Sequence, residues 1–235
     1  MIVGFVSDAH GNPLGLERCL QALQQAGAER IYFLGDSIGY MPNGDAVLSR
    51  LESVGAICIR GNHEEMLLGN LPFTEAQDAV YRIRETRSLL DPCWIDWIEG
   101  WPLRREVVID DLRLLLVHGS PLDPIAGYVY SDTDLSAFGD LPFDFMLLGH
   151  THRPFTRAIG SVTVVNVGSC GLPRDVGNLA SCAVCDTQAR TASIVRVEFD
   201  AQSVLTTLGE RIHESVAACL QRRQTTPAVP RRIDA

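Results

Sequence analysis

The stretch LLGHTHRP, residues 147–154, joins the end of a buried strand to a pair of histidines. The run FDFMLLG (143–149) is apolar enough for a strand in the core of a protein. Gly149 ends that run, and His150 and His152 follow with one threonine between them. A core strand has no use for two imidazoles at this point, so the stretch indicates a sheet whose strand ends carry a functional site.

Four other strand ends in the chain carry side chains of the same kinds. Because the carboxyl ends of strands in a parallel-type sheet converge on one crevice, we expect these loops to meet. The four stretches are VSDAHGN (6–12), FLGDS (33–37), IRGNHEE (59–65) and LVHGS (116–120). With LGHTH (148–152), the side chains expected at the crevice are Asp8, His10, Asp36, Asn62, His63, His118, His150 and His152.

This mixture of carboxylate, imidazole and amide oxygen suits a divalent ion such as manganese, iron or zinc. One ion takes about four to six ligands, so eight candidates fit two sites that share a bridging carboxylate. A single histidine at a strand end is usually a hydrogen-bonded structural residue. The recurrence of histidine at several matching strand ends favours metal binding.

Strand and helix signals alternate through the first part of the chain, which predicts parallel strands covered by helices. Residues 63–99 are predicted to be mainly helical, and short connections after residue 150 suggest hairpins. The predicted fold is α/β, a four-layer αββα sandwich of two mixed β-sheets flanked by helices. The expected strands are 2–6, 31–35, 56–59, 105–109, 112–117, 143–149, 155–159, 162–167, 180–186 and 192–199.

Composition limits the classes of protein to consider. The net charge of −9 argues against binding to long nucleic acid, which depends on basic patches. No run approaches about 20 apolar residues, so no membrane span is expected. The seven cysteines form no disulfide framework, and together with the absence of a signal-peptide pattern they indicate a cytoplasmic protein.

Two further features have a functional and a structural interpretation. Cys182 and Cys185 have the spacing of half a zinc site or a redox pair, but we favour two small residues of a strand, because no partner ligands are visible. The segment 203–222 is expected to form one amphipathic helix, with His213 on its surface. The last residues, 224–235, are polar and contain proline, and we expect them to be frayed.

The blocks DAH, GD, GNH, HG and GHTH, in this order, resemble the five signature motifs of the calcineurin-like metallophosphoesterases. The resemblance covers residues 2–198, and the chain looks like the compact prokaryotic phosphodiesterase branch. NVGSCGLPRD (166–175) is similar to the glycine-rich NPGSxxxPR segment of that branch, with Val167 in place of the usual proline. The resemblance implies a catalytic domain over 1–200, followed by a C-terminal helix and tail over 201–235.

The resemblance also implies a role for each residue of the crevice. The chain would hydrolyse a phosphate ester by in-line attack of a hydroxide held between two divalent ions, among manganese, iron, zinc, cobalt or nickel, with manganese favoured in vitro. His63 would protonate the leaving group or stabilise its charge. The implied ligands are Asp8, His10 and His152 for the first metal, Asp36 as the bridge, and Asn62, His118 and His150 for the second metal.

Two departures from the family pattern narrow the expected substrate. In the protein phosphatases and the diadenosine-tetraphosphate hydrolases, an arginine that grips phosphate follows the bridging aspartate, whereas SIGYMP (37–42) contains none. Gly39 stands where the phosphatases use a second aspartate to orient the leaving-group histidine. Positive charge for the phosphate would then come from Arg60 and Arg174, each of which could equally be an ordinary ion-pair residue.

We therefore expect a phosphodiesterase acting on a small phosphate ester, with self-association into a homo-oligomer left open. The alternatives are a non-catalytic metal-binding scaffold, a phosphomonoesterase or phosphoprotein phosphatase, and a nuclease. Segments 63–99 and 119–134 are expected to wall the pocket. Tyr40, Tyr128 and Tyr130 are candidates to stack a base, with plain packing as the alternative.

Overall fold

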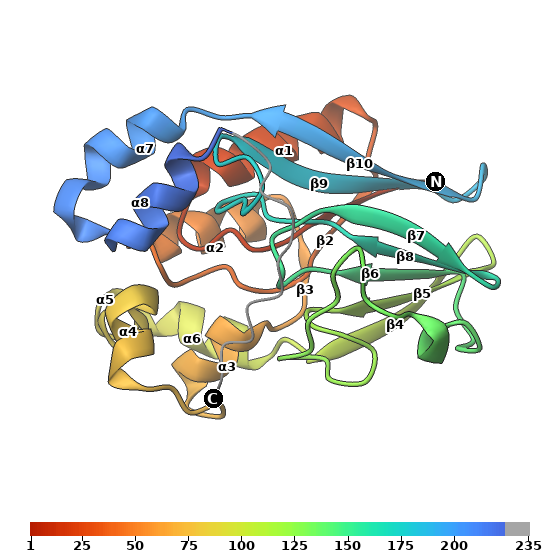
Figure 1. Cartoon of the computed structure of the whole chain (residues 1–235), viewed down its shortest axis with the longest axis horizontal. Helices are drawn as coiled ribbons and strands as arrows, with labels where there is room; N and C mark the ends of the chain where they lie inside the picture. The colour runs from red at the N-terminus through yellow and green to blue at the C-terminus, as the bar shows by residue number, and fades with distance from the viewer. Residues whose placement is uncertain (224–235) are drawn as a thin grey trace.

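The computed structural model of the chain describes residues 1–223 and shows two five-stranded sheets packed together, with helices around them (Figure 1). The first sheet has the strand order β10-β9-β1-β2-β3, and the second has the order β4-β5-β6-β8-β7. The strands are β1 (Ile2–Val6), β2 (Arg30–Phe33), β3 (Ile57–Cys58), β4 (Arg104–Ile109), β5 (Leu112–Val117), β6 (Phe145–Leu148), β7 (Phe155–Ile159), β8 (Val162–Asn166), β9 (Leu179–Asp186) and β10 (Thr191–Glu198).

The parallel part of the first sheet follows from the alternation of strands and helices. Strands β1, β2 and β3 run parallel, and the connections between them contain α1 (Pro13–Gln25) and α2 (Gly44–Ser53). The Asn12 side chain caps α1 by accepting the N–H of Gly15, and Pro13 occupies the first turn. β9 and β10 extend this sheet as an antiparallel hairpin, and β9 pairs with β1.

The second sheet combines a parallel centre with two antiparallel hairpins. β5, β6 and β8 are parallel neighbours, while β4 and β7 pair antiparallel with β5 and β8. The carboxyl ends of β5 and β6 therefore lie at the same edge, and each is followed by one of the predicted histidine loops.

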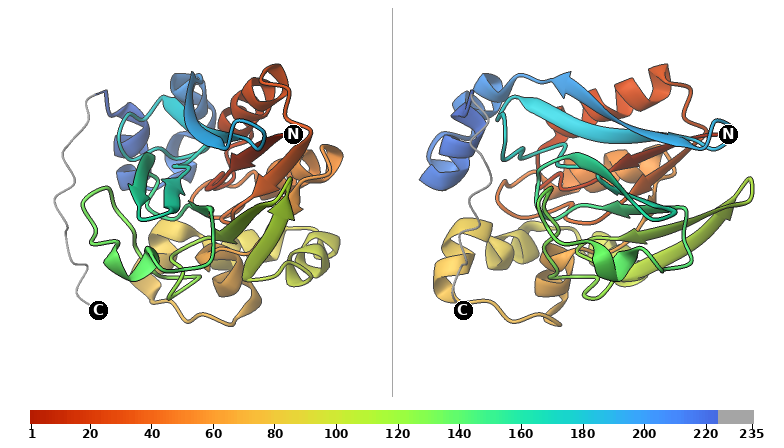
Figure 2. Two further views of the ribbon diagram at one scale, coloured as in Figure 1. Left: turned by 90° about the vertical axis from the view of Figure 1, so that its right-hand side faces the viewer. Right: turned by 45° about the vertical axis from the view of Figure 1, so that its right-hand side comes forward.

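Alternation along β1 shows how the layers are assembled. Val3 and Phe5 pack between the two sheets against residues such as Leu114 and Leu147, whereas Val6 faces the helices that cover the first sheet. The outer face of the second sheet packs against the segment 119–144, which contains a 3-10 turn at Ser136–Phe138. The views in Figure 2 show these layers from the side and confirm the predicted α/β sandwich of two mixed sheets.

The predicted helical segment 63–99 contains four short helices. They are α3 (Asn62–Leu68), α4 (Glu75–Tyr81), α5 (Ile83–Leu89) and α6 (Pro92–Glu99). Arg82 separates α4 from α5 because its φ of 57° cannot continue a right-handed helix.

The single helix expected over 203–222 is wrong. The structure has α7 (Ala201–Leu208), a 3-10 turn at Gly209–Arg211, and α8 (Glu214–Gln221). Gly209 has a φ of 51° and ends α7, and the side chain of His213 caps α8 by accepting the N–H of Ser215. His213 is thus half-buried at a helix start. The predicted frayed segment 224–235 lies outside the described residues, and the division at residue 200 stays a prediction.

The CxxC pair lies within β9, as the structural interpretation predicted. Cys182 packs on the helix side of the sheet and Cys185 packs between the sheets, so the two thiols point to opposite faces and cannot share an ion. Within residues 1–223, no helix has the length and apolar character needed to cross a membrane.

Candidate metal centre

All eight predicted crevice residues meet at the carboxyl edge of the strands. Asp8 and His10 follow β1, Asp36 follows β2, and Asn62 and His63 open α3 just after β3. The remaining three residues, His118, His150 and His152, follow β5 and β6. The eight side chains are buried.

Much of this edge is built from left-handed backbone, which is uncommon outside glycine. The φ angles are 56° at Asp8, 48° at His10, 61° at Asp36, 66° at His150 and 56° at His152. Such conformations cost free energy and persist where the surrounding structure enforces them, typically at functional sites.

Gly149 shows how closely these loops approach one another. A Cβ added at this position would lie 2.3 Å from Ser7 Oγ and 2.7 Å from Asp8 Oδ2. Asp8 Oδ2 in turn accepts the backbone N–H of His150 at 3.0 Å. Glycine is therefore needed here for close approach, which allows the loop after β6 to place its histidines beside Asp8.

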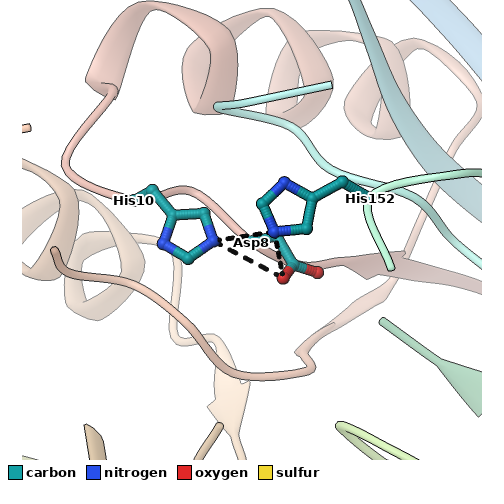
Figure 3. A group of neighbouring side chains, drawn as sticks. All are labelled: Asp8, His10 and His152. Atoms are coloured by element: carbon teal, nitrogen blue, oxygen red, sulfur yellow. Dashed lines mark hydrogen bonds and ion pairs between the residues drawn. The ribbon is translucent and has the colours of Figure 1, made fainter. Parts of the chain in front are cut away.

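The first group of ligating side chains consists of Asp8, His10 and His152 (Figure 3). The two Nε2 atoms are 3.1 Å apart. Asp8 Oδ1 lies 3.6 Å from His10 Nε2 and 3.3 Å from His152 Nε2. These three atoms are close enough to contact one ion placed between them.

The second group surrounds His118. Its Nε2 lies 3.3 Å from Asp36 Oδ2, 3.1 Å from Asn62 Oδ1 and 3.2 Å from His150 Nδ1. Asp36 Oδ2 also lies 3.6 Å from His10 Nε2, in the first group. One carboxylate oxygen therefore stands between the two groups, where a bridging ligand would be.

The hydrogen bonds of the imidazoles show that the centre suits cations. The Nδ1 atoms of His10, His118 and His152 lie within 3.1 Å of the carbonyl oxygens of Ile38, Leu34 and Leu172, respectively. A carbonyl can only accept, so each Nδ1 carries a proton, and in the neutral ring that binds metal each Nε2 presents a lone pair to the centre. Because the Nε2 atoms of His10 and His152 face each other, two lone pairs meet at 3.1 Å without a proton between them.

Among the described residues, several buried side-chain atoms have no hydrogen-bond partner, and two of them belong to the residues of these two groups. They are Asp8 Oδ1 and His150 Nε2. Buried polar atoms of native proteins are nearly always satisfied. A cation in each group would satisfy the facing lone pairs and Asp8 Oδ1 together, so the residues present fit two metal ions.

The electrostatics of the protein without metal lead to the same conclusion. Burial alone would raise the pKa of the Asp36 carboxyl, but the neighbouring imidazoles of His118 and His63 hold it well below its usual range. Burial alone would lower the pKa of His118, but the Asp36 carboxylate outweighs it and raises this pKa to about 10. A positive charge beside Asp36 is therefore favoured. Burial holds the pKa values of His150 and His152 well below normal, so both are neutral, as metal ligands must be.

His63 lies at the side of the centre, with its Nε2 3.9 Å from Asp36 Oδ2. Its ring stacks on Tyr40, with centroids 4.9 Å apart, and lies 4.8 Å from the ring of Tyr81. Burial lowers the pKa of His63 to about 3. A Cβ added at Gly39 would lie 2.2 Å from His63 Nδ1, so glycine is required at this position for the ring to take its place. Aromatic rings, and not an aspartate at position 39, therefore orient His63.

Glu64 is a positioning residue that the sequence interpretation missed. Its buried carboxylate accepts the backbone N–H groups of Asp36, Ser37 and Gly61 at 2.6–2.8 Å and the Ser37 hydroxyl at 2.7 Å. Glu64 thereby ties the loop after β2 to the start of α3. The only signal in the sequence is its place in IRGNHEE, three residues after Gly61, where a side chain can reach back to the helix start.

The glycine-rich segment after β8 also positions ligands. Asn166 donates its amide to the Gly149 carbonyl at 2.7 Å and to Thr151 Oγ1 at 3.0 Å. Ser169 donates its hydroxyl to the Asp8 carbonyl at 2.7 Å. The sequence of this segment alone did not predict these roles.

The two arginines proposed to bind phosphate have different surroundings. Arg174 lines a hollow of about 50 Å³ in front of the metal centre, together with His63, and donates to Tyr40 Oη at 3.0 Å. Arg60 does not line this hollow, and its Nη1 pairs with Glu65 at 3.1 Å. Arg60 thus forms the ion pair that the alternative interpretation expected, and its role toward the substrate stays a prediction.

Tyrosines surround the same hollow. Tyr40, Tyr81 and Tyr128 line it, and the Tyr128 ring lies 4.1 Å from the ring of His150. Tyr130 does not line it and stacks on Tyr128. Each of the two segments expected to wall the pocket thus contributes a residue to this hollow. Tyr81, at the end of α4, belongs to 63–99, and Tyr128 belongs to 119–134.

Comparison with known proteins identifies the family. A family model described as the calcineurin-like phosphoesterase superfamily domain matches residues 1–190, so the chain belongs to this superfamily. The uncharacterized protein MJ0912 of Methanocaldococcus jannaschii is 28% identical over 219 residues, which cover 85% of this chain and 88% of the relative. Phosphodiesterase YfcE of Escherichia coli K12 is 27% identical over 195 residues, which cover 77% of this chain and 85% of the relative. The crystal structure of a metallophosphoesterase from Sphaerobacter thermophilus is 25% identical and aligns with a TM-score of 0.79, over 94% of this chain and 98% of that one.

Proposed function

We propose that this chain is a metal-dependent phosphoesterase with two divalent ions, acting on a small phosphodiester in preference to a phosphoprotein. The observation that carries the proposal is that ring nitrogens and carboxylate oxygens face one another in two groups that share Asp36 Oδ2. Asp8, His10 and His152 would hold one ion, and Asn62, His118 and His150 the other, with Asp36 between them.

Two bound divalent ions would supply an activated water at neutral pH and would neutralise charge on the phosphate. The chain itself contributes shape and positive charge around that chemistry. Arg174 presents a guanidinium to the hollow, where it can bind a phosphate oxygen. The rings of Tyr40, Tyr81 and Tyr128 enclose the hollow and reduce its access to water.

His63 would act on the leaving group by donating a hydrogen bond. Because its pKa is about 3 in the free protein, its ring is neutral at pH 7 and carries one N–H. Such a ring can stabilise the negative charge that develops on the leaving oxygen, the second of the two roles expected from the sequence.

Three observations favour a small diester. The segment 37–42 contains no arginine, and the net charge of −9 disfavours polyanions. The relative YfcE is named a phosphodiesterase. The cytoplasmic location and manganese as the ion used in vitro belong to the same proposal.

Hydrolysis of bis(p-nitrophenyl) phosphate by the manganese-loaded protein tests this function. We expect turnover, and we expect Asp36→Asn to lose both turnover and bound metal, because Asp36 contacts both groups. Asp132→Asn, at an exposed position, is the matched control and should behave as the wild type. Absence of bound metal together with absence of hydrolysis under manganese, cobalt and nickel would refute the proposal and favour a non-catalytic scaffold.

A further inference from the structure

A second, larger hollow lies directly beside the one in front of the metal centre. Its volume is about 610 Å³, within the range of small-molecule sites. It lies between α4 and α8, which are at the same end of the two sheets (Figure 1). We call it the α4/α8 cavity. Its lining residues are Tyr40, Ala76, Gln77, Val80, Tyr81, Tyr128, Leu172, Arg174, Ser215, Val216 and Cys219.

The α4/α8 cavity is continuous with the candidate metal centre. Tyr40, Tyr81, Tyr128 and Arg174 line both this cavity and the smaller hollow. A molecule with its phosphate at the metal centre could therefore extend past these four side chains into the larger space. The small hollow, at about 50 Å³, is much smaller than the α4/α8 cavity.

The lining favours a ligand with an apolar ring system. Tyrosine rings, Val80, Leu172 and Val216 present apolar surface, and Gln77 and Ser215 supply a few polar atoms. Among residues 1–223, Arg174 is the one charged residue of the lining, and it stands at the boundary with the small hollow. Such a surface stabilises apolar and aromatic groups, while the charge at its inner end suits a phosphate.

The position of His63 indicates which part of a substrate enters the cavity. Its ring lies within 5 Å of the rings of Tyr40 and Tyr81, which form the boundary between the two hollows. On the proposed function, His63 acts on the leaving oxygen. The group attached to that oxygen then lies on the cavity side.

We propose that the α4/α8 cavity receives the leaving alcohol, and that the substrates are phosphate esters whose leaving alcohol is a bulky, mainly apolar ring system. In the reaction, water adds to phosphorus, the bond from phosphorus to the alcohol oxygen breaks, and the alcohol departs with one of the protons of that water. Helices α4 and α8 set the size of the alcohol. This inference rests on the proposed function, because it assumes ester hydrolysis at the metal centre.

Two substrates with leaving phenols of similar acidity but different length test the inference. They are methyl phenyl phosphate and methyl 4-biphenylyl phosphate, compared by kcat/KM with manganese-loaded protein. We expect the biphenylyl ester to be preferred about tenfold or more, since the second ring gains apolar contacts. Equal kcat/KM values for the two esters would overturn the inference.

Helix α4 offers a matched pair of variants. Ala76 and Ala79 are both exposed alanines of α4, and only Ala76 lines the cavity. Ala76→Trp should fill the space and abolish the preference, by lowering the kcat/KM of the biphenylyl ester to that of the phenyl ester. Ala79→Trp should retain the preference. Identical profiles for the two variants, at unchanged thermal stability, would contradict a role for α4.

A binding measurement tests ligand binding in the α4/α8 cavity independently of ester hydrolysis. We expect calorimetry with manganese-loaded protein to show biphenyl-4-ylmethylphosphonate binding about tenfold or more tightly than methylphosphonate, and Ala76→Trp to remove the difference. If this difference is found but neither ester is hydrolysed, the proposed function fails and the cavity is a ligand site. If both esters are hydrolysed without preference and the phosphonates bind equally, the proposed function stands and the cavity inference fails.

Discussion

Replacement of Glu64 by glutamine tests how the ligand loops are held. The carboxylate accepts four hydrogen bonds, from three backbone N–H groups and the Ser37 hydroxyl. Glutamine keeps the size of the glutamate side chain and one of its two oxygens. Its NH₂ group would replace the oxygen that faces Ser37, where the hydroxyl can turn to accept from it but the Ser37 N–H is left without an acceptor.

The size of the effect follows from those contacts. A hydrogen bond to a charged group contributes about 1.5–3 kcal/mol and a neutral one about 0.5–1.5 kcal/mol, so losing one bond and the charge on the others costs roughly 3–6 kcal/mol. Part of this is offset, because burial and the nearby Asp36 carboxylate raise the pKa of Glu64 and so disfavour its charged form. We expect a net loss of roughly 2–4 kcal/mol from the free energy of unfolding, a large share of the stability of a domain.

Two measurements check this prediction. Urea unfolding in EDTA gives the loss of stability without metal, and calorimetry gives the manganese affinity, which should weaken by about 10–100-fold because Asp36 loses its support. Glu99→Gln, at an exposed position on α6, should change neither quantity. A Glu64→Gln protein with wild-type stability and wild-type manganese affinity would refute the idea that this carboxylate holds the centre together.

Three further predictions follow from the buried rings and thiols. Gly39→Ala should reduce kcat by about 100-fold with metal content unchanged, since the new Cβ would displace the His63 ring; metal analysis and turnover test this, and normal kcat would contradict it. Burial lowers the pKa values of His63, His150 and His152, so below about pH 6.5 the unfolded chain binds more protons than the folded one, and stability falls as the pH falls towards 3. Each of these three histidines contributes about 1.4 kcal/mol per pH unit below about pH 6.5 in EDTA-treated protein, where His118, whose pKa is raised, is protonated in both states. Equal urea midpoints at about pH 6.5 and pH 5 would be inconsistent with this. Cys93 is the exposed one of the seven cysteines and should react first with a thiol reagent, whereas earlier modification of a buried thiol, seen by mass spectrometry, would show that the native fold opens there.

The types of the elements were largely predictable because hydrophobic patterning is a local property. The runs before Asp8, Asp36 and His118 are apolar and end at polar residues, so strands could be assigned without any tertiary information. The prediction of one helix over 203–222 was wrong because of the backbone conformation of a single residue. The apolar residues on both sides of Gly209 have helical spacing, but the positive φ of Gly209 ends α7.

The candidate ligand set was also accessible from the sequence, since strand ends in a mixed sheet converge on one edge. The supporting contacts were not. Glu64 and Asn166 act through hydrogen bonds to loops that are remote in the sequence, and no residue spacing encodes those partners. The pairing of Arg60 with Glu65 likewise depends on side-chain direction.

The sequence by itself determined the succession of strands and helices and the residues at the strand ends, because both depend on short-range pattern. Only the tertiary structure decided that Asp36 lies between the two ligand groups and that Cys182 and Cys185 face opposite sides of β9. It also decided that α4 and α8, more than 130 residues apart in the chain, enclose one cavity beside the candidate metal centre. These features depend on how the sheets pack and which loops meet, and those distances result from the burial of apolar faces far apart in the sequence.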